Sequence, residues 1–186
     1  MHERVILLVG EETDDTVIGN VEEHLGTQYR LKTETVSFSK FDRPVERVLY
    51  LLYLSDTEIR ALFKSEAVAF MEAGILPNDL CPYAMRSYGI AHDLLEAIDD
   101  VMKAEEATTV DLLRCNGLPV IGNIVIGNVH GMNRVHDVYT GILQKTAAFF
   151  ASFKALSFQH YTITTAKGNI TSTAATGIMI FEHNVS

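Results

Sequence analysis

Apolar residues form several short runs in the first half of the chain, each of the length typical of a buried strand. Val5–Val9 is continuously apolar, which is the pattern of a strand covered on both faces. Arg47–Leu54 is almost continuously apolar, and Tyr29–Val36 alternates between apolar and polar residues. A fourth strand region is predicted over Ala67–Met71 and Gly74–Leu76.

Helical spacing appears between these strands. Thr16–Leu25 carries apolar residues at helical spacing, and Gly26 follows it, where a helix C-terminus favours glycine. Thr57–Phe63 predicts a short helix with Asp56 as its N-cap. Ala91–Lys103 is the clearest amphipathic helix, with an apolar stripe on one side and carboxylates on the other. Alternating strands and helices predict a parallel sheet with right-handed crossovers.

The pattern changes at the polar segment 105–108, where we predict a domain boundary. Beyond it, Asn116-Gly117 and Lys167-Gly168 each separate two strand-like runs, which predicts two hairpins. The predicted elements here are strands over Thr109–Arg114, Pro119–Val129, Gln159–Thr165, Asn169–Thr173 and Gly177–Phe181, and one helix over Gly141–Leu156. The predicted fold class is α/β: a Rossmann-like parallel sheet domain over residues 1–104, followed by a β-rich domain with one inserted helix over residues 105–186.

The charge of the chain is unevenly distributed. The 186 residues carry 24 acidic and 15 basic side chains, and the first 106 residues hold 21 of the acidic and 10 of the basic ones. An acidic half argues against nucleic-acid binding, which depends on neutralising phosphates with basic residues. A solvated acidic surface explains the same charge without any partner.

Cysteine usage and hydropathy indicate the compartment. Cys81 and Cys115 stand far apart with no C-x-x-C spacing, which argues against a disulfide framework or a cysteine zinc site and favours a reducing, cytoplasmic location. No apolar run approaches the roughly 18–20 residues that span a bilayer. No transmembrane segment is therefore expected, and peripheral membrane contact remains open.

The stretch Gly74–Ile90 carries the most informative local sequence. It begins G-I-L-P and ends R-S-Y-G-I. This frame resembles the diacylglycerol kinase catalytic-domain family of lipid kinases, relatives of NAD-kinase-like proteins. In that family a buried strand ends in G-x-L-P or I-L-P, an L-G-T-G-N-D turn follows, and a helix runs to an R-S-L-G-I-like end. The two ends of this family pattern are separated by the same number of residues in this chain.

The second half is similar to the same family. Val110–Gly117 reads V-D-L-L-R-C-N-G, close to the V-D-L-x-R-x-N-G strand and turn through which family members enter a β-rich second domain. The family then continues with a strand, a helix and a final V-x-N strand. These three elements look similar, in order, to Ile121–Asn133, Lys145–Leu156 and Ile178–Asn184. The resemblance is collinear over residues 45–184, and no single element of it is specific.

Three loops depart from the family pattern. Gly10–Asp15 is acidic where the family has an N-P-x-S-G phosphate loop, and Leu54–Glu58 retains only Asp56 of a G-G-D-G-T loop. Residues 79–83 replace the glycine-rich turn. Carboxylates repel phosphates unless a metal intervenes, and added Cβ atoms block the close approach of backbone N–H groups. The family also continues well beyond the equivalent of Ser186, so the match is degenerate and short at its C-terminal end.

The resemblance implies ATP- and Mg²⁺-dependent phosphoryl transfer to a lipid hydroxyl, such as that of diacylglycerol, in an impaired form. It assigns no catalytic residue and places Mg²⁺ at Asp56. The nucleotide-binding residues that it implies are Ser55, Asp56, Thr57, Asn78, Asp79 and Arg86.

Four of these residues also have a structural interpretation. Asp56 is suited to cap the helix that follows it, and Asn78-Asp79 to form a polar turn. Arg86 is suited to an ion pair with a nearby carboxylate. Cys81, in the rewritten loop, is expected to be exposed and is a candidate reactive thiol only if a cation lowers its pKa.

Two further functions stay open beside the kinase. One is a non-catalytic binding or scaffold protein, that is, a pseudokinase, which would hold a small acidic-patch partner or a second copy of the chain; a lipid or a nucleotide is the small-molecule partner that the resemblance implies. The predicted strand near Phe181 favours a homo-oligomer, because an exposed edge strand pairs readily with another copy. The other is a nucleotide sensor that binds ATP without transferring phosphate.

Overall fold

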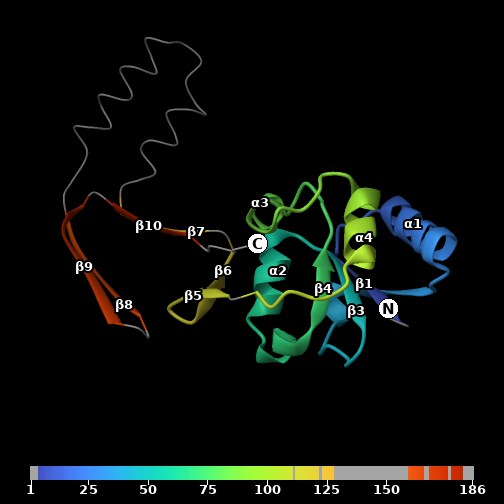
Figure 1. Cartoon of the computed structure of the whole chain (residues 1–186), viewed down its shortest axis with the longest axis horizontal. Helices are drawn as coiled ribbons and strands as arrows, with labels where there is room; N and C mark the ends of the chain where they lie inside the picture. The colour runs from blue at the N-terminus through green and yellow to red at the C-terminus, as the bar shows by residue number, and fades with distance from the viewer. Residues whose placement is uncertain are drawn as a thin grey trace, which may run out of the picture. The chain divides into compact units, whose positions relative to one another are not determined.

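The computed structural model describes residues 4–110, 112–121, 123–127, 159–165, 168–175 and 177–181 (Figure 1). The chain forms two compact units, one reaching to Gly122 and the other covering Asn123–Phe181. The first unit contains an α/β sheet with its helices. The described residues of the second unit are all in strands.

Four parallel strands form the sheet of the first unit, in the order β2-β1-β3-β4. They are β1 (Val5–Val9), β2 (Thr33–Ser37), β3 (Leu49–Tyr53) and β4 (Glu72–Ile75). β1 lies between two neighbours, with Leu7 opposite Thr35 of β2 and Leu51 of β3. The prediction of an α/β fold with a Rossmann-like parallel sheet is confirmed.

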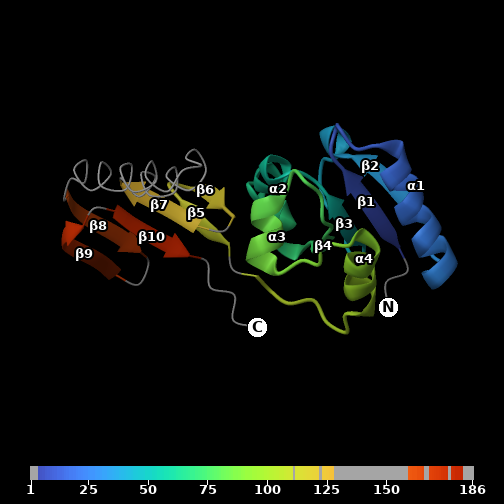
Figure 2. The same cartoon turned by 90° about the horizontal axis from the view of Figure 1, so that it is seen from above.

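Helices cover both faces of this sheet and make three layers (Figure 2). On one face lie α1 (Asp15–His24) and α4 (Leu94–Lys103), and on the other lie α2 (Asp56–Phe63) and α3 (Pro82–Tyr88). Successive side chains of a strand point to opposite faces, so β1 sends Ile6 and Leu8 towards α2 and α3 and its other residues towards α1 and α4. Burial on both faces explains why this strand has no polar position.

The connections from β1 and from β3 lead to strands at opposite edges of the sheet. α1 joins β1 to β2 on one face, and α2 joins β3 to β4 on the other. The topological switch point therefore lies where β1 and β3 pair. Open α/β sheets bind their ligands at the carboxyl ends of the strands beside this point. The loops after β1, β3 and β4 all open at this edge.

The first helix ends differently from its prediction. α1 stops at His24 and continues as a π-helical segment, η1 (Leu25–Tyr29), so Gly26 does not end the helix. The left-handed residue that closes the segment is Arg30, with φ 56°. Leu25 is fully buried and its carbonyl accepts a hydrogen bond from the N–H of Leu31 at 3.2 Å. Packing of Leu25 therefore holds the chain in helical turns beyond the glycine.

One predicted strand segment is helical instead. Residues 67–71 were expected to extend the fourth strand, but the chain there forms a 3₁₀ helix, η3 (Glu66–Phe70). Val68 and Met71 are three residues apart and both pack against the core, whereas Phe70 is 92% exposed. Three residues make one 3₁₀ turn, which places the first two on the same side. A second 3₁₀ helix, η2 (Phe38–Lys40), follows β2.

Side-chain hydrogen bonds join α4 to the end of α1 and to the end of η1. Asp99 of α4 accepts from Tyr29 Oη at 2.8 Å, and His24 Nε2 lies 2.8 Å from the same oxygen. Lys103 Nζ donates to the other Asp99 oxygen at 2.7 Å. The hydrogen bonds from Lys103, His24 and Tyr29 hold the pKa of Asp99 well below its usual range.

The second half of the chain contains the predicted hairpins. β5 (Leu113–Cys115) pairs with β6 (Leu118–Val120) in the first unit, and both turn residues, Asn116 and Gly117, have positive φ. That geometry is typical of a type I′ turn, so this hairpin prediction is confirmed. In the second unit β8 (Gln159–Thr165) pairs with β9 (Gly168–Ala175), and β7 (Asn123–Gly127) pairs with β10 (Gly177–Phe181).

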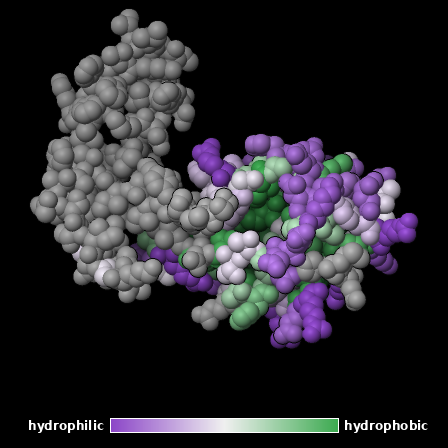
Figure 3. All heavy atoms as spheres, viewed as in Figure 1, coloured by the Kyte–Doolittle hydropathy of each residue, from purple (hydrophilic) through white to green (hydrophobic). Residues whose placement is uncertain are grey.

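The predicted helix over Gly141–Leu156 lies outside the described residues, and the division at 104/105 stays a prediction. Within the described part of the chain, no helix is long and apolar enough to cross a bilayer. Hydrophilic side chains cover much of the visible face of the first unit, with apolar surface between them (Figure 3).

Candidate functional site

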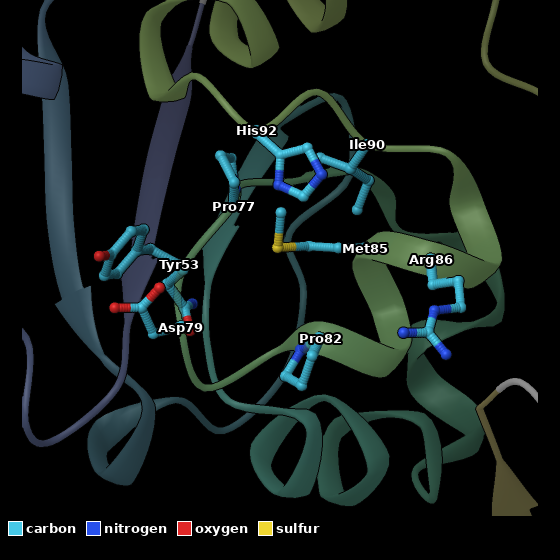
Figure 4. Close-up of a pocket in the computed structure, with 9 residues that line it drawn as sticks. Tyr53, Pro77, Asp79, Pro82, Met85, Arg86, Ile90 and His92 are labelled. Atoms are coloured by element: carbon cyan, nitrogen blue, oxygen red, sulfur yellow. The ribbon is translucent and has the colours of Figure 1, made fainter. Parts of the chain in front are cut away.

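A pocket of about 580 Å³ opens at the carboxyl edge of the sheet, between the end of β3, the loop after β4, and α3 (Figure 4). We call it the β4–α3 pocket. Its lining residues are Tyr53, Pro77, Asn78, Asp79, Pro82, Met85, Arg86, Ile90 and His92. Asn78, Asp79 and Arg86, three of the residues expected at a nucleotide site, therefore come together here.

Asn78 fixes the loop that forms one wall of this pocket. Its Nδ2 donates to the carbonyl of Leu54 at 3.0 Å, and its Oδ1 accepts from the N–H of Leu80 at 2.7 Å. The first bond ties the loop to the end of β3, and the second is the local bond of an Asx turn. The structural interpretation of Asn78 as a turn residue is confirmed, while the side chain of Asp79 stays exposed beside the pocket.

Asp56 caps a helix, but not the one that follows it. Its carboxylate accepts hydrogen bonds from the N–H groups of Tyr83 at 3.0 Å and Ala84 at 2.9 Å, which are in the first turn of α3. The residue is only 9% exposed. The prediction of Asp56 as the N-cap of α2 is wrong, because Ser55 occupies that position. The Mg²⁺ role of Asp56 stays a prediction, and the described residues contain no group of three or more metal-ligating side chains.

Ser55 and Glu58 close the N-terminus of α2 by a reciprocal capping box. Ser55 Oγ accepts from the N–H of Glu58 at 3.2 Å, and Glu58 Oε2 accepts from the Ser55 N–H at 2.8 Å and from its hydroxyl at 2.7 Å. The signal for this motif is the S-x-x-E spacing, which sequence reasoning missed. Thr57, the remaining expected ligand, lies exposed in the first turn of α2.

The Glu58 carboxylate also lies against the loop after β1. A Cβ atom added to Gly10 would come within 2.7 and 2.9 Å of the two Glu58 oxygens, and the Gly10 N–H donates to the carbonyl of Tyr53 at 3.1 Å. Glu58 therefore places a negative charge at the switch point between β1 and β3. A helix N-terminus at this position is where phosphate groups bind in many α/β proteins, and here the protein's own carboxylate is bound there.

The charged side chains of the β4–α3 pocket are of both signs. Burial raises the pKa of the Tyr53 hydroxyl, and the negative charge of Asp79 raises it further. Arg86 stands on the opposite side of the pocket, with Met85 between it and the Tyr53–Asp79 side (Figure 4). The predicted ion pair of Arg86 has no counterpart among the described residues.

Cys81 is part of the structural framework beside the pocket. The expectation that it is exposed is wrong, because its side chain is fully buried. Its Sγ lies 3.6 Å from the carbonyl oxygen of Leu76 and 3.5 Å from that of Asn78, either of which can accept its single S–H hydrogen, and burial raises the pKa of the thiol. A thiol with a raised pKa contains little thiolate at neutral pH and is a poor nucleophile.

We expect the two cysteines to react with a thiol reagent at very different rates in the folded protein. Cys115 is partly exposed, so it should react within minutes with 5,5′-dithiobis(2-nitrobenzoate) at pH 8. Cys81 should react at least about tenfold more slowly, because only local opening exposes it. In urea both should react together, and a fast Cys81 in the folded chain would contradict its burial.

No protein-family model matches this chain, and no curated protein is significantly similar to it. The assignment to the lipid-kinase family stays a prediction. Sequence reasoning found Asn78 and Asp79 on the loop after β4, and Arg86 on α3. It missed Tyr53, Met85, Ile90 and His92, which reach the pocket from the end of β3, from α3 and from the segment after α3.

Proposed function

We propose that this chain is a lipid-kinase-like protein that acts by binding and has lost phosphoryl transfer, that is, a pseudokinase. The observation that supports this proposal is that side chains of the protein already occupy two helix N-termini at the carboxyl edge of the sheet. The first N–H groups of α3 are bound by Asp56, and the N-terminus of α2 is closed by Ser55 and Glu58. The groups that would hold a phosphate therefore already have partners within the chain.

The magnitude of the electrostatic repulsion supports the loss of ATP binding. Two like unit charges 4 Å apart repel by about 4 kcal/mol at an effective dielectric constant near 20. A dissociation constant of 1 mM corresponds to only about 4 kcal/mol of binding free energy. A phosphate at the switch point would lie beside Glu58 and near the acidic loop after β1, so repulsion of this size removes most of an ordinary affinity for ATP.

The proposal keeps the rest of the family resemblance. It includes a β-rich second domain with an inserted helix after the Rossmann-like domain, a cytoplasmic location and self-association into a homo-oligomer. Its lipid partner would be reached by peripheral contact with a membrane. The competing functions are an active ATP- and Mg²⁺-dependent lipid kinase, which would use Asp56 for the metal, and a nucleotide sensor.

A titration with ATP and Mg²⁺ separates these functions. We expect 10 mM Mg·ATP to change the melting temperature of the purified chain by less than about 1 °C, whereas a dissociation constant of 0.1 mM would stabilise it by about 2.7 kcal/mol. For a chain of this size that stabilisation corresponds to roughly 5–10 °C. Calorimetry at the same concentrations should detect no heat of binding.

A phosphoryl-transfer assay with diacylglycerol micelles and labelled ATP completes the test. We expect no labelled lipid. Stabilisation by ATP without labelled lipid would establish the sensor instead, and labelled lipid would establish the kinase. A melting curve with Mg²⁺ alone is the control for effects of the metal that do not involve the nucleotide.

A further inference from the structure

The β4–α3 pocket has a negatively charged side. Asp79 is exposed there beside Tyr53, and no hydrogen bond or ion pair of the described residues neutralises the Asp79 carboxylate. The raised pKa of Tyr53 reflects burial first and then the negative charge of Asp79. This side of the pocket therefore favours a positively charged group on a ligand.

The opposite side carries the positive charge. Arg86 is in the last turn of α3, and its guanidinium has no ion-pair partner among the described residues. Figure 4 shows Arg86 and the Tyr53–Asp79 pair on opposite sides of Met85. A guanidinium that is free to pair favours a carboxylate or phosphate on a ligand.

Apolar side chains lie between the two charged sides, and His92 and Asn78 are further polar lining residues. The apolar residues are Pro77, which is buried, Pro82, Met85 and Ile90. The volume of about 580 Å³ is within the range of pockets that hold small molecules. A purely apolar ligand would remove water from Asp79 and Arg86 without replacing its hydrogen bonds, which is unfavourable.

We propose that the β4–α3 pocket binds a small zwitterion, with its ammonium group at Asp79 and Tyr53, its carboxylate or phosphate at Arg86, and a short apolar spacer over Met85. A simple anion would satisfy Arg86 but meet Asp79, and a simple cation would do the reverse. Only a molecule that carries both charges compensates both sides of the pocket. This inference rests on the proposed function of the site as a binding pocket without phosphoryl transfer.

The test uses 6-aminohexanoate as the probe and hexanoate and hexylamine as matched molecules that each lack one charge. Amide chemical shifts of the isotope-labelled full chain report binding and its location. We expect the zwitterion to shift the amides of residues 77–92 and to bind at least about tenfold more tightly than either matched molecule, because each charged contact contributes that much or more. Equal binding of hexanoate or hexylamine, or no shift at 20 mM probe, would overturn the inference.

Two pocket variants and two control variants sharpen this test. Arg86→Gln and Asp79→Asn should each weaken binding of 6-aminohexanoate by about tenfold. Arg60→Gln and Asp42→Asn change the same kinds of exposed side chain outside the pocket and should leave binding unchanged. Unaltered binding in Asp79→Asn or Arg86→Gln would rule out the assigned contacts, provided the melting temperature matches that of the unsubstituted chain.

The proposed function and the zwitterion inference can each be overturned without the other. Stabilisation by ATP overturns the proposed function whatever the probe does. If ATP has no effect and the probe does not bind, the pseudokinase assignment stands and the zwitterion is wrong.

Discussion

Replacement of Asp56 by alanine is expected to lower the free energy of unfolding by about 2–4 kcal/mol, a large part of the roughly 5–15 kcal/mol typical of a domain. The carboxylate accepts the N–H groups of Tyr83 and Ala84 at the start of α3, and the residue is 9% exposed. Alanine would leave both N–H groups without an acceptor in a place that water reaches poorly. Urea unfolding should show a lower midpoint with an unchanged slope.

Asp93→Ala is the matched control for this substitution. Asp93 also accepts two backbone N–H groups, those of Leu95 at 3.0 Å and Glu96 at 2.9 Å, but at the exposed start of α4. Water can replace the carboxylate there, so we expect a loss of only about 1 kcal/mol. Asp56→Asn keeps one acceptor and should fall between the two. Equal losses for Asp56→Ala and Asp93→Ala would show that burial of the α3 cap adds nothing to stability.

A second large effect is expected for Gly74→Ala, which should cost about 2–3 kcal/mol by overpacking. A Cβ atom at Gly74 of β4 would lie 2.3 and 2.6 Å from the two methyl carbons of Val101 in α4. Valine has one strongly preferred rotamer in a helix, so the side chain cannot easily turn away. The helix must move from the sheet, and urea unfolding measures the resulting loss.

The double variant Gly74→Ala/Val101→Ala tests the contact directly. Removal of the two methyl groups of Val101 relieves the clash, so the double variant should be more stable than the sum of the two single losses predicts, by about 1 kcal/mol or more. Additive losses would contradict the predicted clash. Gly19→Ala in α1 is the control, because nothing lies within 4 Å of its added Cβ. It should stabilise the helix by about 0.5–1 kcal/mol.

The positions of β1 and β3 could be predicted from the sequence because burial on both faces excludes polar residues. β1 has the predicted bounds, and β3 lies within its predicted range. β10 also has the bounds that its apolar run predicts. The Asn116-Gly117 turn was predictable for a local reason as well, since both residues tolerate positive φ. Helix ends were less predictable, because the π-helical turns at Leu25 and the 3₁₀ turns before Met71 depend on core contacts that local spacing does not reveal.

The candidate site could be predicted only in part. The loop after β4 and Arg86 stood out because their local sequence is unusual, and they lie around one pocket. Tyr53 and His92 could not be placed there from sequence, because they are separated by 39 positions and meet only when β3 and the segment after α3 are folded. The capping box at Ser55 and Glu58 was visible in the sequence as S-x-x-E, but its effect on the switch point was not.

The sequence by itself determined the parallel α/β sheet of the first unit, because alternation of apolar runs and amphipathic helices allows few other arrangements. Only the tertiary structure decided what Asp56 and Glu58 do. Asp56 finds its partners 27 and 28 residues away in α3, and Glu58, in the helix after β3, approaches Gly10, in the loop after β1. Both contacts join segments that are distant in the chain, and a carboxylate has the same local sequence whether it binds a metal or caps a remote helix.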